Sequence, residues 1–314
     1  MRAAWVAAER VTEVRDAARG WKKAGAIDET TLAAIESEFP PSRLELARAW
    51  KALIFVLVSV AIVGLQFGVF GLDTRGSGRF FVSAAILVAV TEVLRHSRLA
   101  GTGSDAATSF WAVVNLLIGV GVLFDSEEVT LISAVACVDL AAASWRWGFA
   151  LYGAFAAVAG FVFLARSPYG RPGWTVAGAL LVVASARLAG RASLSPSRRR
   201  AFAGVFVVSA LAVYGAVNLY SRDERLIEAI GLFEAPRSFT APASGARPVF
   251  VVATALLPVL FLFWGVRARR RLILDTGALL AALSILTLHY YVRFGSVAIT
   301  VFGLALIGLA LWLN

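Results

Sequence analysis

One carboxylate lies deep within an apolar stretch of the sequence, where a charged group is costly. Asp139 lies in the apolar run 129–144, about 8–10 Å from its C-terminal end at a helical rise of 1.5 Å per residue. Charged groups at such a depth in a membrane are default functional candidates. Asn115, near the middle of the preceding run, is the expected partner. The alternative is purely structural, with Asp139 bonded to Asn115 or reaching towards Arg146.

A proline in the middle of another apolar run is a second candidate feature. Pro258 removes one backbone N–H and frees the carbonyl of Thr254, which neighbouring helices must then satisfy. Kinked helices often line transporter sites, although proline also occurs in purely structural spans.

Two further polar residues lie on the run 272–291. Asp275, beside Arg269–Arg271, is expected to form an interfacial ion pair. His289, followed by two tyrosines, is either a proton-responsive group or part of an aromatic belt at the membrane surface. Glu92, three residues before Arg95, is expected to pair with it at a helix end.

Motifs of known enzyme classes are missing from the sequence. There is no HExxH pattern and no serine nucleophile elbow, and Gly101–Ser104 is not followed by the lysine of a phosphate-binding loop. One cysteine and two histidines give no metal-ligand spacing, so we expect no metal and no cofactor. A lipid-modifying enzyme that uses His289 with Glu228 is an alternative that no spacing supports.

The elements that position these residues are apolar helices. Hydrophobic residues make up 59% of the chain and charged residues 16%, which a soluble fold of this length could not bury. We therefore predict an all-α transmembrane bundle over residues 50–314. The ten predicted spans, of which the second and fourth are short, are Trp50–Phe70, Phe80–Leu94, Ala106–Phe124, Val129–Ser144, Trp147–Ala165, Gly173–Ala189, Ala201–Tyr220, Val249–Val266, Leu272–Tyr291 and Ser296–Leu313.

The distribution of arginine predicts the orientation of the bundle. The net charge is +10, and the strongest basic clusters, 198–200 and 269–271, fall in loops on the same side as the N-terminus. Because cytoplasmic loops carry the excess of Lys and Arg, we expect both termini in the cytoplasm of a bacterium with the bundle in its plasma (inner) membrane. The charge then reflects topology rather than nucleic-acid binding. The outer loop 221–247 is expected to carry a short interfacial helix or to be a solvated loop.

Residues 1–49 form the polar N-terminal part of the chain and predict a cytoplasmic helical hairpin. Trp5, Val11, Val14 and Trp21 recur at helical spacing and form an apolar stripe from about residue 3 to residue 24. Gly25 suits the end of this helix, and Asp28 suits the N-cap of the next. The stripe is a candidate surface for docking a cytoplasmic protein.

The run Gly20–Glu29, with Trp21, a glycine four residues later and then Ile27, is similar to the opening of an uncharacterised family of membrane proteins. That family is described as containing domain of unknown function 2157. The segments Leu274–Gly277 and His289–Val292 resemble its distal part. The resemblance covers the hairpin and the general multi-span layout, and it implies no activity, cofactor or catalytic residue.

Two functions are compatible with these features. The first is transport or permeation of a small solute, with Asp139, Asn115 and the Pro258 kink near a central site. The second is a non-enzymatic membrane scaffold or sensor that docks a partner through the hairpin. Beyond the lipid bilayer, the sequence identifies no partner, and it does not give the oligomeric state.

Overall fold

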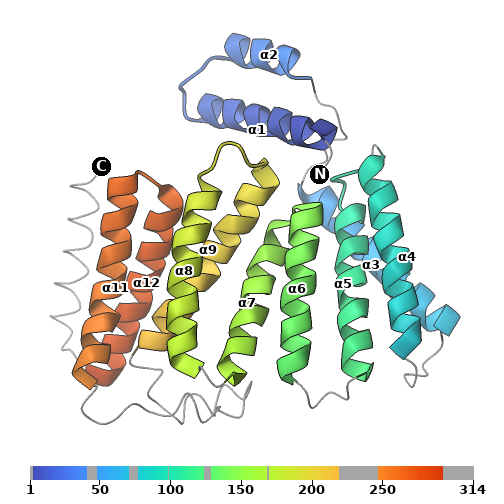
Figure 1. Cartoon of the computed structure of the whole chain (residues 1–314). Coiled ribbons are helices and arrows are strands. Elements are labelled where there is room, and N and C mark those ends of the chain that lie inside the picture. Colours follow the sequence, from blue (N-terminus) through green and yellow to red (C-terminus); the bar gives the residue numbers. More distant parts are fainter. Residues whose placement is uncertain are drawn as a thin grey trace. The chain divides into compact units, whose positions relative to one another are not determined.

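The structure is a computed structural model that describes residues 3–40, 48–70, 77–97, 99–123, 129–167, 170–218 and 247–292 (Figure 1). Within these ranges every regular element is an α-helix, and the described residues contain no strand. The all-α prediction is therefore confirmed for the described part of the chain. The predicted span Ser296–Leu313 and the loop 221–246 lie outside it.

Two helices precede the apolar part of the chain. Helix α1 (Ala3–Lys23) is followed by Gly25, whose φ of 72° is the left-handed conformation expected after a helix. Helix α2 (Glu29–Glu38) begins at Asp28, whose carboxylate accepts a hydrogen bond from the Thr31 amide at 2.8 Å. The N-cap at Asp28 is confirmed, and the first helix, predicted from about residue 3 to residue 24, is confirmed to within one residue.

In the part of the chain that the structure describes, nine apolar helices follow, and eight of them are long and apolar enough to cross a membrane. Such a set is typical of a multi-pass integral membrane protein. The two spans predicted to be short, 80–94 and 129–144, belong to helices of 20 and 19 residues, whereas α7 is the short one at 17 residues. The nine helices are α3 (Arg48–Phe70), α4 (Ser77–His96), α5 (Ser104–Leu123), α6 (Val129–Trp147), α7 (Ala150–Arg166), α8 (Gly170–Ala189), α9 (Pro196–Val217), α11 (Arg247–Ala268) and α12 (Arg271–Val292).

Both predicted spans are found as apolar helices long enough to cross a membrane, but their ends were predicted too short because polar residues at the helix ends were assigned to loops. Helix α4 begins three residues before Phe80, at Ser77, and continues past Leu94 to His96. Helix α6 likewise continues past Ser144 to Trp147. The additional residues include Arg95 and Arg146, whose charges are matched by acidic partners described below.

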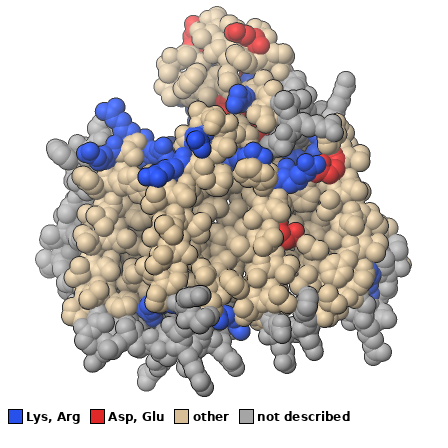
Figure 2. Space-filling view, viewed as in Figure 1, with Lys and Arg blue, Asp and Glu red and all other residues tan. Residues whose placement is uncertain are grey.

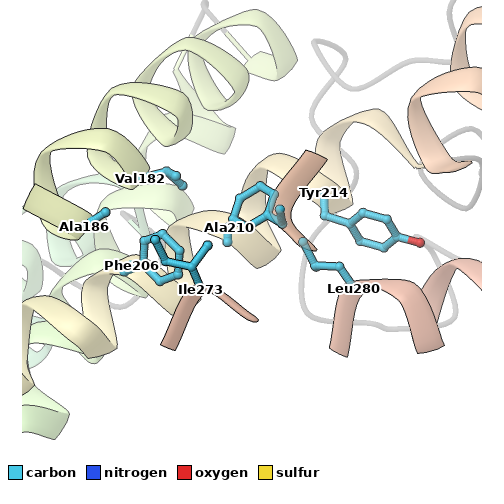
Figure 3. Close-up of a cluster of buried hydrophobic side chains, with 8 residues drawn as sticks. Val182, Ala186, Phe206, Ala210, Tyr214, Ile273 and Leu280 are labelled. Carbon is cyan, nitrogen blue, oxygen red and sulfur yellow. The ribbon is translucent and has the colours of Figure 1, made fainter. Parts of the chain in front are cut away.

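The chain divides into two compact units, which are described separately. The first comprises residues 1–156 and 189–201, and the second residues 157–188 and 202–314. In the first unit, α4 packs along α5, and α3 and α6 also contact α5. In the second, α11 packs along α12, and a buried cluster with Phe206, Ile273 and Leu280 at its centre joins α8, α9, α11 and α12 (Figure 3).

Candidate functional site

Asp139 lies on α6 of the first unit and is half-buried between exposed Val138 and buried Leu140. Its Oδ2 atom is buried and has no hydrogen-bond partner among the described residues. Neither Asn115 nor Arg146 bonds to it, so both structural partners expected from the sequence were wrong. Figure 2 shows that on the face in view the charged side chains gather near helix ends, while the surface between is almost entirely uncharged.

Asn115 is instead part of a satisfied network that joins three helices. Its side chain is 2% exposed, and its Nδ2 donates to the Trp111 carbonyl at 2.7 Å. Gln66 of α3 donates from Nε2 to Asn115 Oδ1 at 3.0 Å and to Ser83 Oγ of α4 at 2.9 Å. These bonds hold α3, α4 and α5 together and account for the buried amide of Asn115.

A buried tyrosine, Tyr152, lies near the N-terminus of α7 in the same unit as Asp139. Tyr152 is 6% exposed, and its hydroxyl lies 2.8 Å from Ser109 Oγ of α5. Since Ser109 donates its hydrogen to the Ala106 carbonyl, Tyr152 is the donor in this pair. Tyr152 also interacts electrostatically with Asp139, Arg95 and Asp105. The charges of the deep carboxylate and of the buried pair at the helix ends therefore both act on the phenol.

That buried pair connects the end of α4 to the start of α5. Arg95 Nε lies 3.8 Å from Asp105 Oδ2, and the two side chains are 9% and 1% exposed. Asp105 Oδ2 also accepts from the Gly101 amide at 3.2 Å, whereas Asp105 Oδ1 is buried and has no hydrogen-bond partner among the described residues. Arg95 additionally donates to the Trp147 carbonyl and lies over the Phe149 ring, 4.9 Å from its centroid.

Glu92 forms a second ionic contact at the same end of the helices. It accepts from Arg146 Nε and Nη2, both at 2.9 Å, and from Trp147 Nε1 at 2.9 Å. The ion pair predicted with Arg95 on the same helix is replaced by this pair between α4 and α6. A two-pronged arginine–carboxylate contact fixes geometry well, which is consistent with a structural role for Glu92.

In the second unit, the carbonyl freed by Pro258 is satisfied as the sequence predicted. Pro258 lies buried inside α11, and Ser284 of α12 donates to the Thr254 carbonyl at 2.6 Å. Since Ser284 has one hydrogen, the Tyr214 hydroxyl of α9, 2.9 Å away, donates to the Ser284 oxygen. The Thr254 carbonyl, Ser284 and Tyr214 thus connect α11, α12 and α9 by hydrogen bonds, and the satisfied carbonyl requires no ligand.

Two predicted candidates, Asp275 and His289, belong to α12. Asp275 is 68% exposed and pairs with Arg271 at 3.5 Å, which confirms the predicted surface ion pair. The backbone of His289 belongs to α12, but its side chain is not among those described.

Helix α1 uses its polar residues within its own unit. Arg15, 6% exposed, donates to the carbonyls of Glu36 and Phe39 at the end of α2, at 3.0 and 2.9 Å. Glu13 accepts from Arg199 at 2.7 Å, and Glu9 accepts from the Ser197 hydroxyl at 2.9 Å. Two faces of α1 are therefore already engaged by the chain itself.

The apolar stripe of α1 is unevenly exposed. Trp21 is 52% exposed, and Val11 and Val14 are half-buried. The side chain of Trp5 lies outside the described residues. Trp21 is thus the clearest surface-exposed member of the predicted docking stripe.

Sequence reasoning missed Gln66, Tyr152 and the Arg95–Asp105 pair. A signal existed for the pair, since two opposite charges flank the short connection between successive apolar runs. No comparable signal identified Tyr152, because an isolated tyrosine near a span end is typical of the membrane interface.

Comparisons with protein-family models, with curated proteins and with solved structures give no match for this chain. The function is therefore argued from the geometry of the first unit. Its distinctive feature is Asp139, a carboxylate within a span that the described residues leave without a hydrogen bond.

Proposed function

We propose that this protein transports, or allows the permeation of, a small solute across a membrane, and that Asp139 acts in that process. The observation that supports this is the unpartnered Oδ2 of Asp139 within α6. The other polar candidates with described side chains have partners: Asn115 bonds to Gln66, the Thr254 carbonyl to Ser284, and Asp275 to Arg271.

The energetic argument starts from the cost of the charge. An aspartate at the centre of a membrane helix costs about 2.5–3.5 kcal/mol on insertion scales. A structural role would offset this cost through hydrogen bonds or an ion pair within the protein, as Arg95 does for Asp105. Asp139 has no such compensation among the described residues. Binding of a solute or ion from outside the chain would explain why a carboxylate is present at this depth.

The proposal includes the setting predicted from the sequence. We place the protein in the plasma membrane of a bacterium with ten spans and both termini cytoplasmic, supported by the positive charge in loops on the N-terminal side. The resemblance to the family with domain of unknown function 2157 belongs to the same proposal.

Flux measurements in proteoliposomes test the proposal. Purified protein would be reconstituted and assayed for uptake of a panel of labelled ions, sugars, amino acids and organic acids. We expect Asp139→Asn to lower the uptake of the transported solute by about tenfold or more. Asp275→Asn is the matched control, since Asp275 is exposed and should leave uptake unchanged. Equal uptake by wild type and Asp139→Asn, or no uptake of any solute, would reject the proposal.

The exposure of Trp21 favours a second candidate, a membrane scaffold or sensor that docks a cytoplasmic protein through α1. An exposed tryptophan is a frequent anchor at protein interfaces. Crosslinking in cells would compare wild type with Trp21→Ala, and Trp50→Ala would serve as control because Trp50 on α3 is similarly exposed. Loss of a crosslinked partner in Trp21→Ala alone would favour docking, and unchanged crosslinks in both variants would contradict it.

A further inference from the structure

We propose that the species that Asp139 binds is a proton, and that Tyr152 and the Arg95–Asp105 pair form the polar route between Asp139 and the ends of the helices. The inference rests on the proposed function in taking Asp139 as the working group of the membrane domain. It goes further by naming the chemical species and the residues that position it.

In the described part of the chain, the surroundings of Asp139 favour a proton over a divalent metal cation held by several carboxylate, histidine or cysteine ligands. Calcium requires six to eight oxygen ligands, and magnesium six in a near-ideal octahedron. Among the described residues, no three His, Cys, Asp or Glu side chains come together in a way that could hold a metal ion. A proton needs a single acceptor, and the buried Oδ2 of Asp139 provides one. An anionic solute is disfavoured because, among the described residues, no arginine or lysine pairs with Asp139 to supply a compensating positive charge.

Protonation also removes the energetic problem of the site. A carboxyl within a membrane span, with one oxygen buried and without a partner, is far less costly as the neutral acid than as the anion. The step is simple and balanced: hydronium donates a proton to Asp139 Oδ2, an O–H bond forms there, and water leaves. The reverse step releases the proton. The site therefore alternates between a neutral and a charged form, which is the property that a proton-coupled transporter requires.

The surroundings provide a polar route in one direction. The hydroxyl of Tyr152 is buried against Ser109 of α5, and the charges of Asp139, Arg95 and Asp105 act on the phenol, so we assign Tyr152 to this route. Another buried carboxylate oxygen without a hydrogen bond among the described residues, Asp105 Oδ1, lies at the ends of the helices. Tyr152 is a positioning residue here, held by Ser109 at 2.8 Å. The titratable and charged groups on these helices near the route are Glu92, Arg95 and His96 on α4, Asp105 on α5, Cys137 and Arg146 on α6, and Tyr152 on α7.

Labelling with dicyclohexylcarbodiimide tests proton binding without any transport assay. This lipid-soluble reagent reacts with protonated carboxyls in apolar surroundings and leaves a stable adduct that carries its whole mass. The full-length protein would be labelled in lipid nanodiscs over a range of pH and mapped by peptide mass spectrometry. We expect the adduct on Asp139, with a yield that falls about tenfold per pH unit above a midpoint.

Four variants make the test specific. Asp139→Asn should lose the adduct, whereas the control Asp275→Asn should retain it. Tyr152→Phe should keep the adduct but move its midpoint to higher pH, because removing a polar neighbour leaves the carboxylate in a more apolar environment. A merely structural role for Tyr152 would leave the midpoint in place. Asp139→Glu tests the site independently if Asp139→Asn fails to fold, and its adduct should appear at the same position.

The outcomes separate this inference from the proposed function. The proton inference is overturned if no adduct forms on Asp139 at any pH, or if its yield does not change with pH. This holds even if solute uptake depends on Asp139. An adduct with the expected pH dependence supports proton binding even if no solute is taken up. A midpoint unchanged in Tyr152→Phe overturns the route through Tyr152.

Discussion

The contact between Ser284 and the carbonyl that Pro258 frees gives the most quantitative prediction. Ser284→Ala removes the donor to the Thr254 carbonyl and the acceptor of the Tyr214 hydroxyl, at 2.6 and 2.9 Å. Hydrogen bonds between membrane helices contribute about 0.6 kcal/mol on average and up to about 1.7 kcal/mol. Two bonds are lost, so we expect the free energy of unfolding to fall by about 1–2 kcal/mol.

A double-mutant cycle with Pro258→Ala isolates the bond to Thr254. Alanine at 258 restores the backbone N–H that can donate to the Thr254 carbonyl within α11. Ser284→Ala should then cost less in the Pro258→Ala background than in the wild type, with a coupling energy of about 0.6–1.7 kcal/mol. Equilibrium unfolding of the purified protein in mixed micelles would supply the four free energies.

Ser185→Ala is the control for this cycle. Ser185 is also buried in the second unit, but its hydroxyl bonds to Leu181 and Val182 of its own helix. Its substitution should show no coupling to Pro258. Additivity of Ser284→Ala and Pro258→Ala within about 0.3 kcal/mol would refute the assigned role of Ser284.

Two further predictions concern the first unit. The hydrogen bonds from Thr31 hold the pKa of Asp28 at about 2, below its unfolded value near 3.8. Because the folded pKa is the lower one, its contribution to α2 is complete above about pH 4 and is lost as the pH falls through about 2. Hydrogen exchange of α2, corrected for intrinsic rates, should show this loss of protection in the wild type. Asp28→Asn should not show it, because asparagine still caps the helix but does not titrate. Identical pH profiles in the two proteins would contradict the prediction. Gly103 has φ 107°, and a Cβ there would lie 2.3 Å from the Lys51 carbonyl oxygen. Gly103→Ala should therefore lower the free energy of unfolding by about 2–4 kcal/mol, from backbone strain and a steric clash. Gly101→Ala, with φ 79° and open space, should cost about 1 kcal/mol, and an equal loss in both would refute the role of the clash.

Local features of the chain were predictable because they depend on neighbouring residues. The ranges of α1 and α2, the cap at Asp28 and the freed carbonyl at Thr254 each follow from residues within about four positions. The Asp275–Arg271 pair is also a contact between residues four positions apart on one helix.

Contacts between helices were predicted poorly, and the reason is physical. In spans that are apolar on all sides, the sequence scarcely encodes which face of a helix meets which neighbour. Asn115 was therefore assigned to Asp139 although it bonds to Gln66, and Glu92 was assigned to Arg95 although it bonds to Arg146. The depth of Asp139 could be derived from spacing, whereas its lack of a partner required the packing of α5, α6 and α7.

The most direct test of the role of Asp139 is dissipation of an imposed pH gradient in proteoliposomes that contain a trapped pH-sensitive dye. Wild type, Asp139→Asn and Asp275→Asn would be compared at equal protein content, with and without the solute panel. We predict that wild-type vesicles dissipate the gradient, that Asp139→Asn slows this by about tenfold or more, and that Asp275→Asn stays within about twofold of wild type. Equal rates in wild type and Asp139→Asn would contradict the account.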